Sequence, residues 1–124
     1  MLRIELEPRR AFEPGEEIAV QLGWDFNTPP ESVELRLVWN TSGKGTQDVG
    51  VASVTPFEFP KAHETRRTTV SLPEQPYSFS GKLISIVWAL ELVALPDEQS
   101  TREEITIGPG AKEVLALGQD NAGA

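Results

Sequence analysis

Residues 68–92 read TTVSLPEQPYSFSGKLISIVWALEL and contain the longest strand signal in the chain. From residue 82 to residue 95, apolar side chains occupy both the even and the odd positions, so both faces of a strand here would be apolar. Fourteen residues of extended chain would measure about 46 Å, more than twice the usual strand length. We therefore predict one oversized central strand that bends or carries a bulge.

Residues 73–81, before this strand, are expected to end one strand and begin another. Pro73 and Pro76 have no N–H to donate to a sheet, so they end the preceding strand. Gly81 would let the backbone reverse or bulge, and Trp88 would then point between two sheets. Pro76, Ser78 and Gly81 are therefore expected to serve the fold rather than a binding site.

Alternation of apolar and polar residues with period two recurs along the rest of the chain, as expected for strands with one buried face. Such series lie at residues 2–6, 18–26, 33–39, 49–51, 68–72 and 105–107. Ten prolines and ten glycines spread along the chain leave pieces too short for helices. This pattern predicts an all-β fold, an antiparallel immunoglobulin-like β-sandwich of about seven strands.

The length of 124 residues fits one domain. We expect residues 1–110 to form the β-sandwich domain and residues 111–124 to form a short C-terminal segment and flexible tail. Residues 111–117 could be a short helix or a last edge strand, and the small, polar residues 118–124 are expected to fray.

Charge and composition exclude several classes of partner. The formal net charge is −8 and the pI is about 4.6, so the surface would repel phosphate backbones, and nucleic acid is not an expected partner. Residues 83–95 are too short to cross a bilayer and include Glu91, which predicts no integral membrane segment. Glu5 and Glu7 interrupt any signal peptide, and there is no cysteine. These features favour a cytoplasmic location.

No catalytic, cofactor or metal constellation is predicted. His63 is the only histidine, lies in a polar segment and has no cysteine to share a zinc ion. Residues 40–46 contain glycines and a lysine but lack the spacing of a phosphate loop, so a hairpin loop is the better interpretation. The best candidates for a calcium site are Asp97, Glu98 and Glu103, although solvated side chains explain them more simply.

Residues 68–92 resemble the arrestin-like family. In that family a strand ends in Leu-Pro, a short Pro/Ser loop follows, and a long strand reads Ile-x-Trp/Tyr-x-Leu-x-Val. The present chain has Leu72-Pro73 followed by Ile86, Trp88 and Leu90.

The opening also fits an arrestin lobe, because the turn Phe12-x-Pro14-Gly15-Glu16 joins residues 4–6 to residues 18–20 as in a first hairpin. The resemblance is best over residues 68–109 and extends over 1–110. It implies a single arrestin-like lobe. Arrestins pair two lobes and sense phosphate between lobe and tail, so receptor binding and phosphate sensing are not carried over.

Three functions are compatible with these features. The resemblance implies a non-enzymatic protein–protein interaction module or scaffold with a protein partner. The alternative is an extracytoplasmic immunoglobulin-like module of an adhesin or secretion apparatus, which a leader in the unprocessed gene product would favour. An enzyme or small-ligand carrier would need a lined cavity, and Trp24, Trp39 and Trp88 are expected to fill the interior.

A partner surface is predicted in residues 55–67, taken as a loop. Phe57 and Phe59 beside Arg66 and Arg67 combine the side chains that interfaces favour. The alternative is that both phenylalanines turn inward and cap one end of the sandwich.

Sheet edges are the second candidate surface, because their unpaired backbone groups allow self-association or strand addition. The first and last strands are the expected edges. Their acidic residues would discourage aggregation; these are Glu5, Glu7, Glu103 and Glu104.

Overall fold

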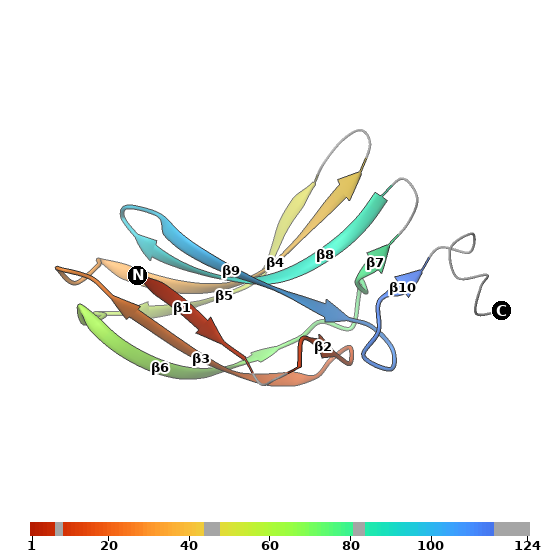
Figure 1. Ribbon diagram of the computed structural model, residues 1–124, viewed down its shortest axis with the longest axis horizontal. Coiled ribbons are helices and arrows are strands. Elements are labelled where there is room, and N and C mark those ends of the chain that lie inside the picture. Colours follow the sequence, from red (N-terminus) through yellow and green to blue (C-terminus); the bar gives the residue numbers. More distant parts are fainter. Residues whose placement is uncertain (7–8, 44–47, 81–83, 116–124) are drawn as a thin grey trace.

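The structure is a computed structural model that describes residues 1–6, 9–43, 48–80 and 84–115 (Figure 1). All of its regular elements are strands, which confirms the predicted all-β class. In chain order they are β1 (Leu2–Glu5), β2 (Ala11–Phe12), β3 (Glu17–Asp25), β4 (Ser32–Gly43), β5 (Val49–Glu58), β6 (His63–Ser71), β7 (Phe79–Ser80), β8 (Ile84–Leu95), β9 (Gln99–Ile107) and β10 (Val114–Leu115). Seven of the described strands have four or more residues, in agreement with the predicted number.

The strands form two layers, as expected for a β-sandwich (Figure 1). The smaller sheet has the order β1-β3-β6, and the larger sheet contains the other seven strands. In the larger sheet β8 is central: β4 covers one of its edges, and β7 and then β9 cover the other. Two short pairings, β2 with β9 and β7 with β10, are parallel, so the sheet is mixed rather than purely antiparallel.

Strand β8 is the predicted long central strand, with 12 described residues. It curves visibly, and its pairing with β4 runs without a register shift from Ile84 to Leu95 (Figure 1). The predicted bulge therefore does not lie in this pairing. The irregularity is instead in the next pairing, between β4 and β5, at Leu37 and Val38. Residues 82–83 of the predicted strand, and Gly81, lie outside the described residues.

The core lies between the two sheets and is closely filled by large side chains. Trp24 from the smaller sheet and Trp88 from the larger are both almost fully buried, which confirms the predicted position of Trp88. Leu22 and Leu90 pack in the same cluster. Trp39 differs from the expectation: it is only partly buried and packs against the margin of the core, because it lies near the end of β4.

The segment before β8 confirms the structural roles of Pro76 and Ser78. The indole N–H of Trp88 donates to the Pro76 carbonyl oxygen (3.0 Å). Ser78 is buried, and its N–H donates to the Ile107 carbonyl oxygen (2.7 Å) while its Oγ accepts from the Ile107 N–H (2.8 Å). This segment therefore fastens the start of β8 to the end of β9.

Beyond β9 the chain turns back and adds one more short strand to the larger sheet. Of the two predicted alternatives for residues 111–117, the described part forms the short strand β10, which pairs with β7. The predicted flexible tail, residues 118–124, lies outside the described residues. The described part of the chain contains no helix that could span a membrane.

Candidate binding surfaces

The predicted partner segment is mostly strand rather than loop. Residues 55–58 belong to β5 and residues 63–67 belong to β6, so only four residues connect them. Phe57 was expected to be exposed, but it is 7% exposed and lies in the core, with its ring 6.3 Å from the Trp24 ring. Phe59 follows the last residue of β5 and is 89% exposed. The two phenylalanines therefore separate, one turning inward and one outward.

The two predicted arginines also lie on opposite faces, because successive strand residues alternate. The Arg66 guanidinium lies 5.6 Å from the centre of the Phe57 ring and pairs with Glu64, so it covers the margin of the core. Arg67 points to the outer face of the smaller sheet and is exposed. Phe57, Phe59, Arg66 and Arg67 thus do not form one continuous surface.

Phe59 belongs instead to one end of the sandwich where three turns meet, which we call the loop end. Its turns are residues 26–31, 59–62 and 96–98. They lie together because Ser32, at the start of β4, pairs with the last residues of both β5 and β8. Backbone hydrogen bonds fix the turns, from Glu31 N–H to the Leu95 oxygen (2.9 Å) and from Phe26 N–H to the Ala62 oxygen (2.8 Å).

A hollow of about 400 Å³ opens at the loop end. Phe26, Pro29, Pro30 and Pro96 contribute to its lining, beside backbone and polar groups of the adjoining turns. Proline fixes φ, so these walls lose little conformational freedom when something binds. The hollow is thus a preorganised surface with a mixed lining, suited to an extended segment that carries polar groups.

Charged side chains at the loop end are paired with one another. His63 Nδ1 lies 2.8 Å from one carboxylate oxygen of Asp25, and the Arg3 guanidinium lies 3.4 Å from the other. The hydrogen bond from His63 lowers the pKa of Asp25 most, and the charges of His63 and Arg3 lower it further. His63 was expected to be simply solvated in a loop; it is the first residue of β6 and pairs with Asp25.

The connection that carries Phe59 is held by Glu64. Its carboxylate accepts from the Lys61 N–H (2.8 Å) and pairs with Arg66. Burial raises the pKa of Glu64, but these hydrogen bonds and the charges of Arg66 and Lys61 together outweigh it, so the pKa is lowered. The Trp24 indole N–H donates to the Lys61 oxygen (2.8 Å) and joins this connection to the core.

The structure does not bring the calcium candidates into one cluster. Asp97 and Glu98 lie in the turn between β8 and β9, whereas Glu103 is in the middle of β9 and is 3.9 Å from Arg10. Among the described residues no group of three or more histidines or carboxylates could hold a metal ion.

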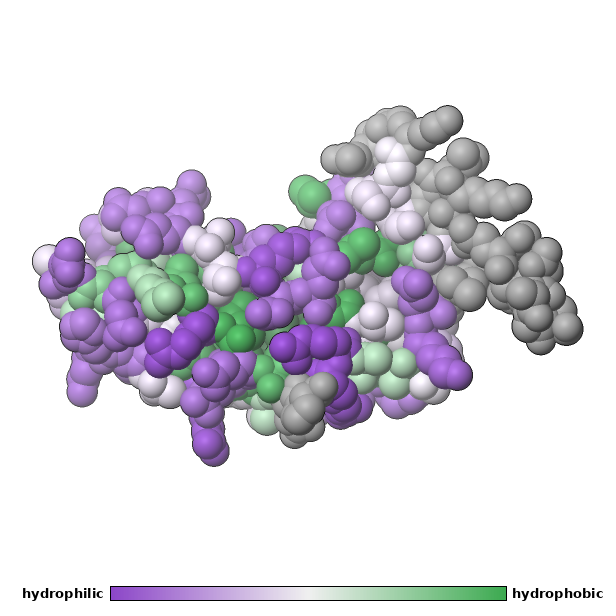
Figure 2. Space-filling view, viewed as in Figure 1, coloured by the Kyte–Doolittle hydropathy of each residue, from purple (hydrophilic) through white to green (hydrophobic). Residues whose placement is uncertain are grey.

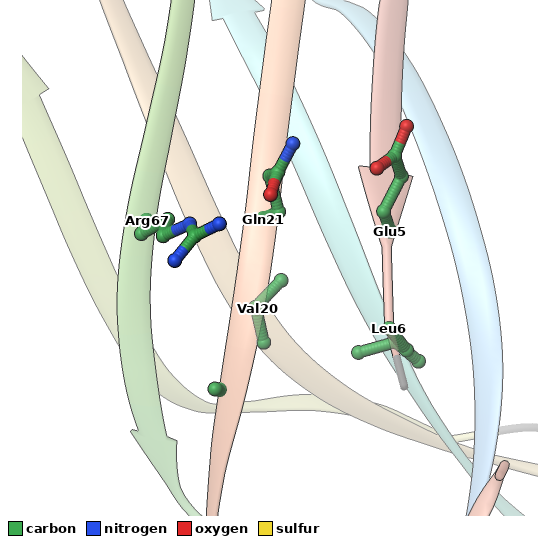
Figure 3. A pocket seen from close by; sticks show the side chains of 6 residues that line it. Glu5, Leu6, Val20, Gln21 and Arg67 are labelled. Atoms are coloured by element: carbon green, nitrogen blue, oxygen red, sulfur yellow. The ribbon is translucent and has the colours of Figure 1, made fainter. Parts of the chain in front are cut away.

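The outer face of the smaller sheet carries a shallow hollow of about 360 Å³ with a mixed polar and apolar lining (Figure 3). Gln21 of β3 pairs with Glu5 of β1 on one side and with Arg67 of β6 on the other, so the three side chains form a row across the sheet. Figure 3 shows Arg67 reaching toward β3 while Glu5 stands on the far strand. Mixed charges beside an amide are typical of a solvated sheet face.

Sequence reasoning missed the exposed valines of β5. Val49, Val51 and Val54 are 80%, 56% and 47% exposed and point to the outer face of the larger sheet. The visible side of the molecule is mostly hydrophilic, with apolar residues reaching the surface between charged ones (Figure 2). The available signal was the absence of charged residues from Val49 to Phe57, but alternation alone does not say which face of a strand is covered.

Comparison with known proteins gives the fold and no family. No family model matches the sequence, and no curated protein matches it. Among solved structures, the sporulation control protein Spo0M from Bacillus subtilis is similar, with a TM-score of 0.63 and 17% sequence identity. The match covers 87% of the present chain and 49% of the Spo0M chain, so this chain spans about half the length of that protein. The likeness supports the β-sandwich and, more weakly, the arrestin-like lobe.

Proposed function

We propose that this chain is a non-enzymatic protein–protein interaction module, built on an arrestin-like β-sandwich, that binds a protein partner through its loop end. The observation that carries the proposal is Phe59, an aromatic side chain that is 89% exposed at the start of a short connection. Glu64 and Trp24 hold that connection through the backbone of Lys61. Aromatic residues, phenylalanine among them, are enriched at protein interfaces. A large apolar side chain held in solvent on a fixed backbone is suited to enter a partner's pocket.

The proline-lined hollow supports the same proposal. It lies at the same end of the sandwich as Phe59, because β4 pairs with both β5 and β8 at Ser32. The partner would therefore meet a protruding ring and a recess together, which fixes its orientation. The paired charges of Asp25, His63 and Arg3 would form a polar rim.

The core supports a binding role rather than a carrier role, since Trp24 and Trp88 fill the space between the sheets. We place the module in the cytoplasm, because a fold without cysteine needs no oxidising compartment. The likeness to Spo0M supports the fold and gives no information about a partner.

The test is capture of binding partners from the native host with the wild-type chain and with Phe59→Ser. A matched control is Val54→Ser, which removes an exposed apolar side chain from the middle of β5, away from the loop end. We expect one stoichiometric partner, whose affinity for the Phe59 variant falls by about tenfold or more, as for a typical interface hot spot.

Arg67→Glu tests whether the outer face of the smaller sheet belongs to the same contact. Arg66 is left unchanged, because its guanidinium covers Phe57 and a substitution there would disturb the fold. Full-strength partner binding by a folded Phe59→Ser chain would place the contact elsewhere. Retention of the wild-type chain in the cell envelope would contradict the cytoplasmic placement.

A further inference from the structure

Strand β5 forms an open edge of the larger sheet. Among the described strands it pairs only with β4, so half of its backbone groups face away from the sheet. Its first residues, Val49 and Val51, are also among the most exposed apolar side chains of the described chain. Beside them lies a hollow of about 480 Å³ that Val38, Val49 and Val51 help to line.

The charges around this hollow are already paired within the chain. Arg102 donates to the Asn40 side-chain oxygen (2.8 Å) and lies 3.4 Å from the carboxylate of Glu91. These polar side chains already have partners within the chain. The exposed valines are the part of the hollow that a second protein surface would cover.

The charges on its edge strands limit which edge a second copy of the chain can present to β5. Two copies of a chain with a net charge of −8 repel each other over most of their surfaces. The other edge strands of four or more described residues carry charges: β1 has Arg3 and Glu5, β6 has Arg66 and Arg67, and β9 has three charged residues in succession. From Val49 to Phe57, strand β5 has none.

Backbone direction sets the register. The Thr41 N–H donates to the Asp48 carbonyl oxygen (2.8 Å), and hydrogen-bonded and non-hydrogen-bonded pairs alternate along an antiparallel ladder. The backbone groups of Val49 and Val51 therefore point away from β4, and those of Gly50 point toward it. Pro56, which has no N–H, and the irregularity near Val38 confine regular pairing to this end of β5.

We infer that a second copy of this chain docks on β5 by antiparallel strand pairing, with Val49 of each copy opposite Val51 of the other. The two-fold axis then passes between the two Gly50 residues, where the absence of side chains allows close approach. The interface is isologous, so it closes at a dimer instead of growing into a fibre. This inference does not depend on the loop end and stands or falls separately from the proposed function.

Sedimentation equilibrium of the full chain over a wide concentration range tests the inference. We expect a reversible monomer–dimer equilibrium whose dissociation constant rises about tenfold or more in Val51→Lys, because a lysine on the open edge opposes pairing. The matched control is Thr65→Lys, which adds the same charge to the exposed side of β6 and should leave the equilibrium unchanged. A chain that stays monomeric, or a dimer that Val51→Lys does not weaken, would overturn the inference.

Cross-linking tests the register without any destabilising substitution. The chain has no cysteine, so single cysteines can be introduced cleanly. A mixture of Val49→Cys and Val51→Cys chains should give more heterodimer with a short thiol-specific reagent than either variant gives alone. Cross-linking through Thr65→Cys at an equal rate would instead point to random collision and contradict the pairing.

Discussion

Trp88 connects three parts of the molecule through one side chain. Its ring is buried among residues of both sheets, and its indole N–H reaches the Pro76 carbonyl oxygen in the segment before β8. Trp39 lies directly opposite it on β4 but is only partly buried. Trp88 is thus buried more deeply than Trp39, although the two residues face each other across the strand pair. The reason is that the smaller sheet covers the centre of β4 but not its end.

Truncation of Trp88 should be severe. Trp88→Ala removes a buried ring and leaves a cavity, which lowers the free energy of unfolding by about 3–5 kcal/mol, a large part of the stability of a small domain. Chemical denaturation measures the loss. Trp88→Phe, which keeps most of the ring but orphans the Pro76 carbonyl, should lose less. A Trp88→Ala chain with an unchanged melting temperature would contradict the packing described.

At the scale of elements, short segments hold the long strands in place. β7 has only two residues, yet the adjacent Ser78 exchanges two hydrogen bonds with Ile107 at the end of β9. β2 pairs with the same end of β9 from the other side. The two-residue strands β2, β7 and β10 lie toward the right-hand side of Figure 1, where short pairings and polar contacts hold the ends of the long strands.

Ser78→Ala tests this role. The substitution leaves the Ile107 N–H without its acceptor inside the protein, and an orphaned buried donor costs about 1–3 kcal/mol. We expect a lower denaturation midpoint and faster amide hydrogen exchange at the end of β9. Ser100→Ala, at an exposed position near the start of β9, is the matched control and should have little effect. Equal stability of the two variants would show that the Ser78 contact is not structural.

Acidic side chains outnumber basic ones in the whole molecule. At three separate places, nearby donors and cations lower the pKa of a carboxyl group. The pKa of Glu16 is lowered, mainly by a hydrogen bond from Arg9 and then by the Glu13 N–H. The pKa values of Asp25 and Glu64 are lowered as well. Each folded pKa lies below the unfolded one, so the stabilisation is present at neutral pH and is lost as the pH falls below the usual carboxyl range, about 4.

The double variant Glu16→Gln, Asp25→Asn should therefore be less stable than the wild type at neutral pH, and the difference should shrink below about pH 4. Acid also lowers the overall negative charge of both proteins. Comparing their stabilities at the same pH cancels this shared effect. Glu58→Gln, at the exposed end of β5, is the control for loss of one charge. Thermal unfolding across this range gives the result. A difference that grows in acid would reverse the assigned direction.

Alternation along the chain was enough to predict the all-β class, the number of long strands and the burial of Trp88. The Pro76–Ser78 segment was likewise identified as structural. These features are local, because period two places alternate side chains on one face and proline cannot donate to a ladder. Of the predicted partner residues, Phe59 has the exposed position that was expected, while Phe57 does not.

Local patterns along the chain specify which residues can form strands and where the strands must stop. Which faces of those strands are covered depends on how the two sheets pack. Phe57 and Val54 belong to the same apolar strand, yet one meets Trp24 and the other meets solvent, since the smaller sheet lies on one side of β5 and nothing described lies on the other. Edge positions and the meeting of three turns at the loop end likewise depend on strand order, which period-two alternation does not encode.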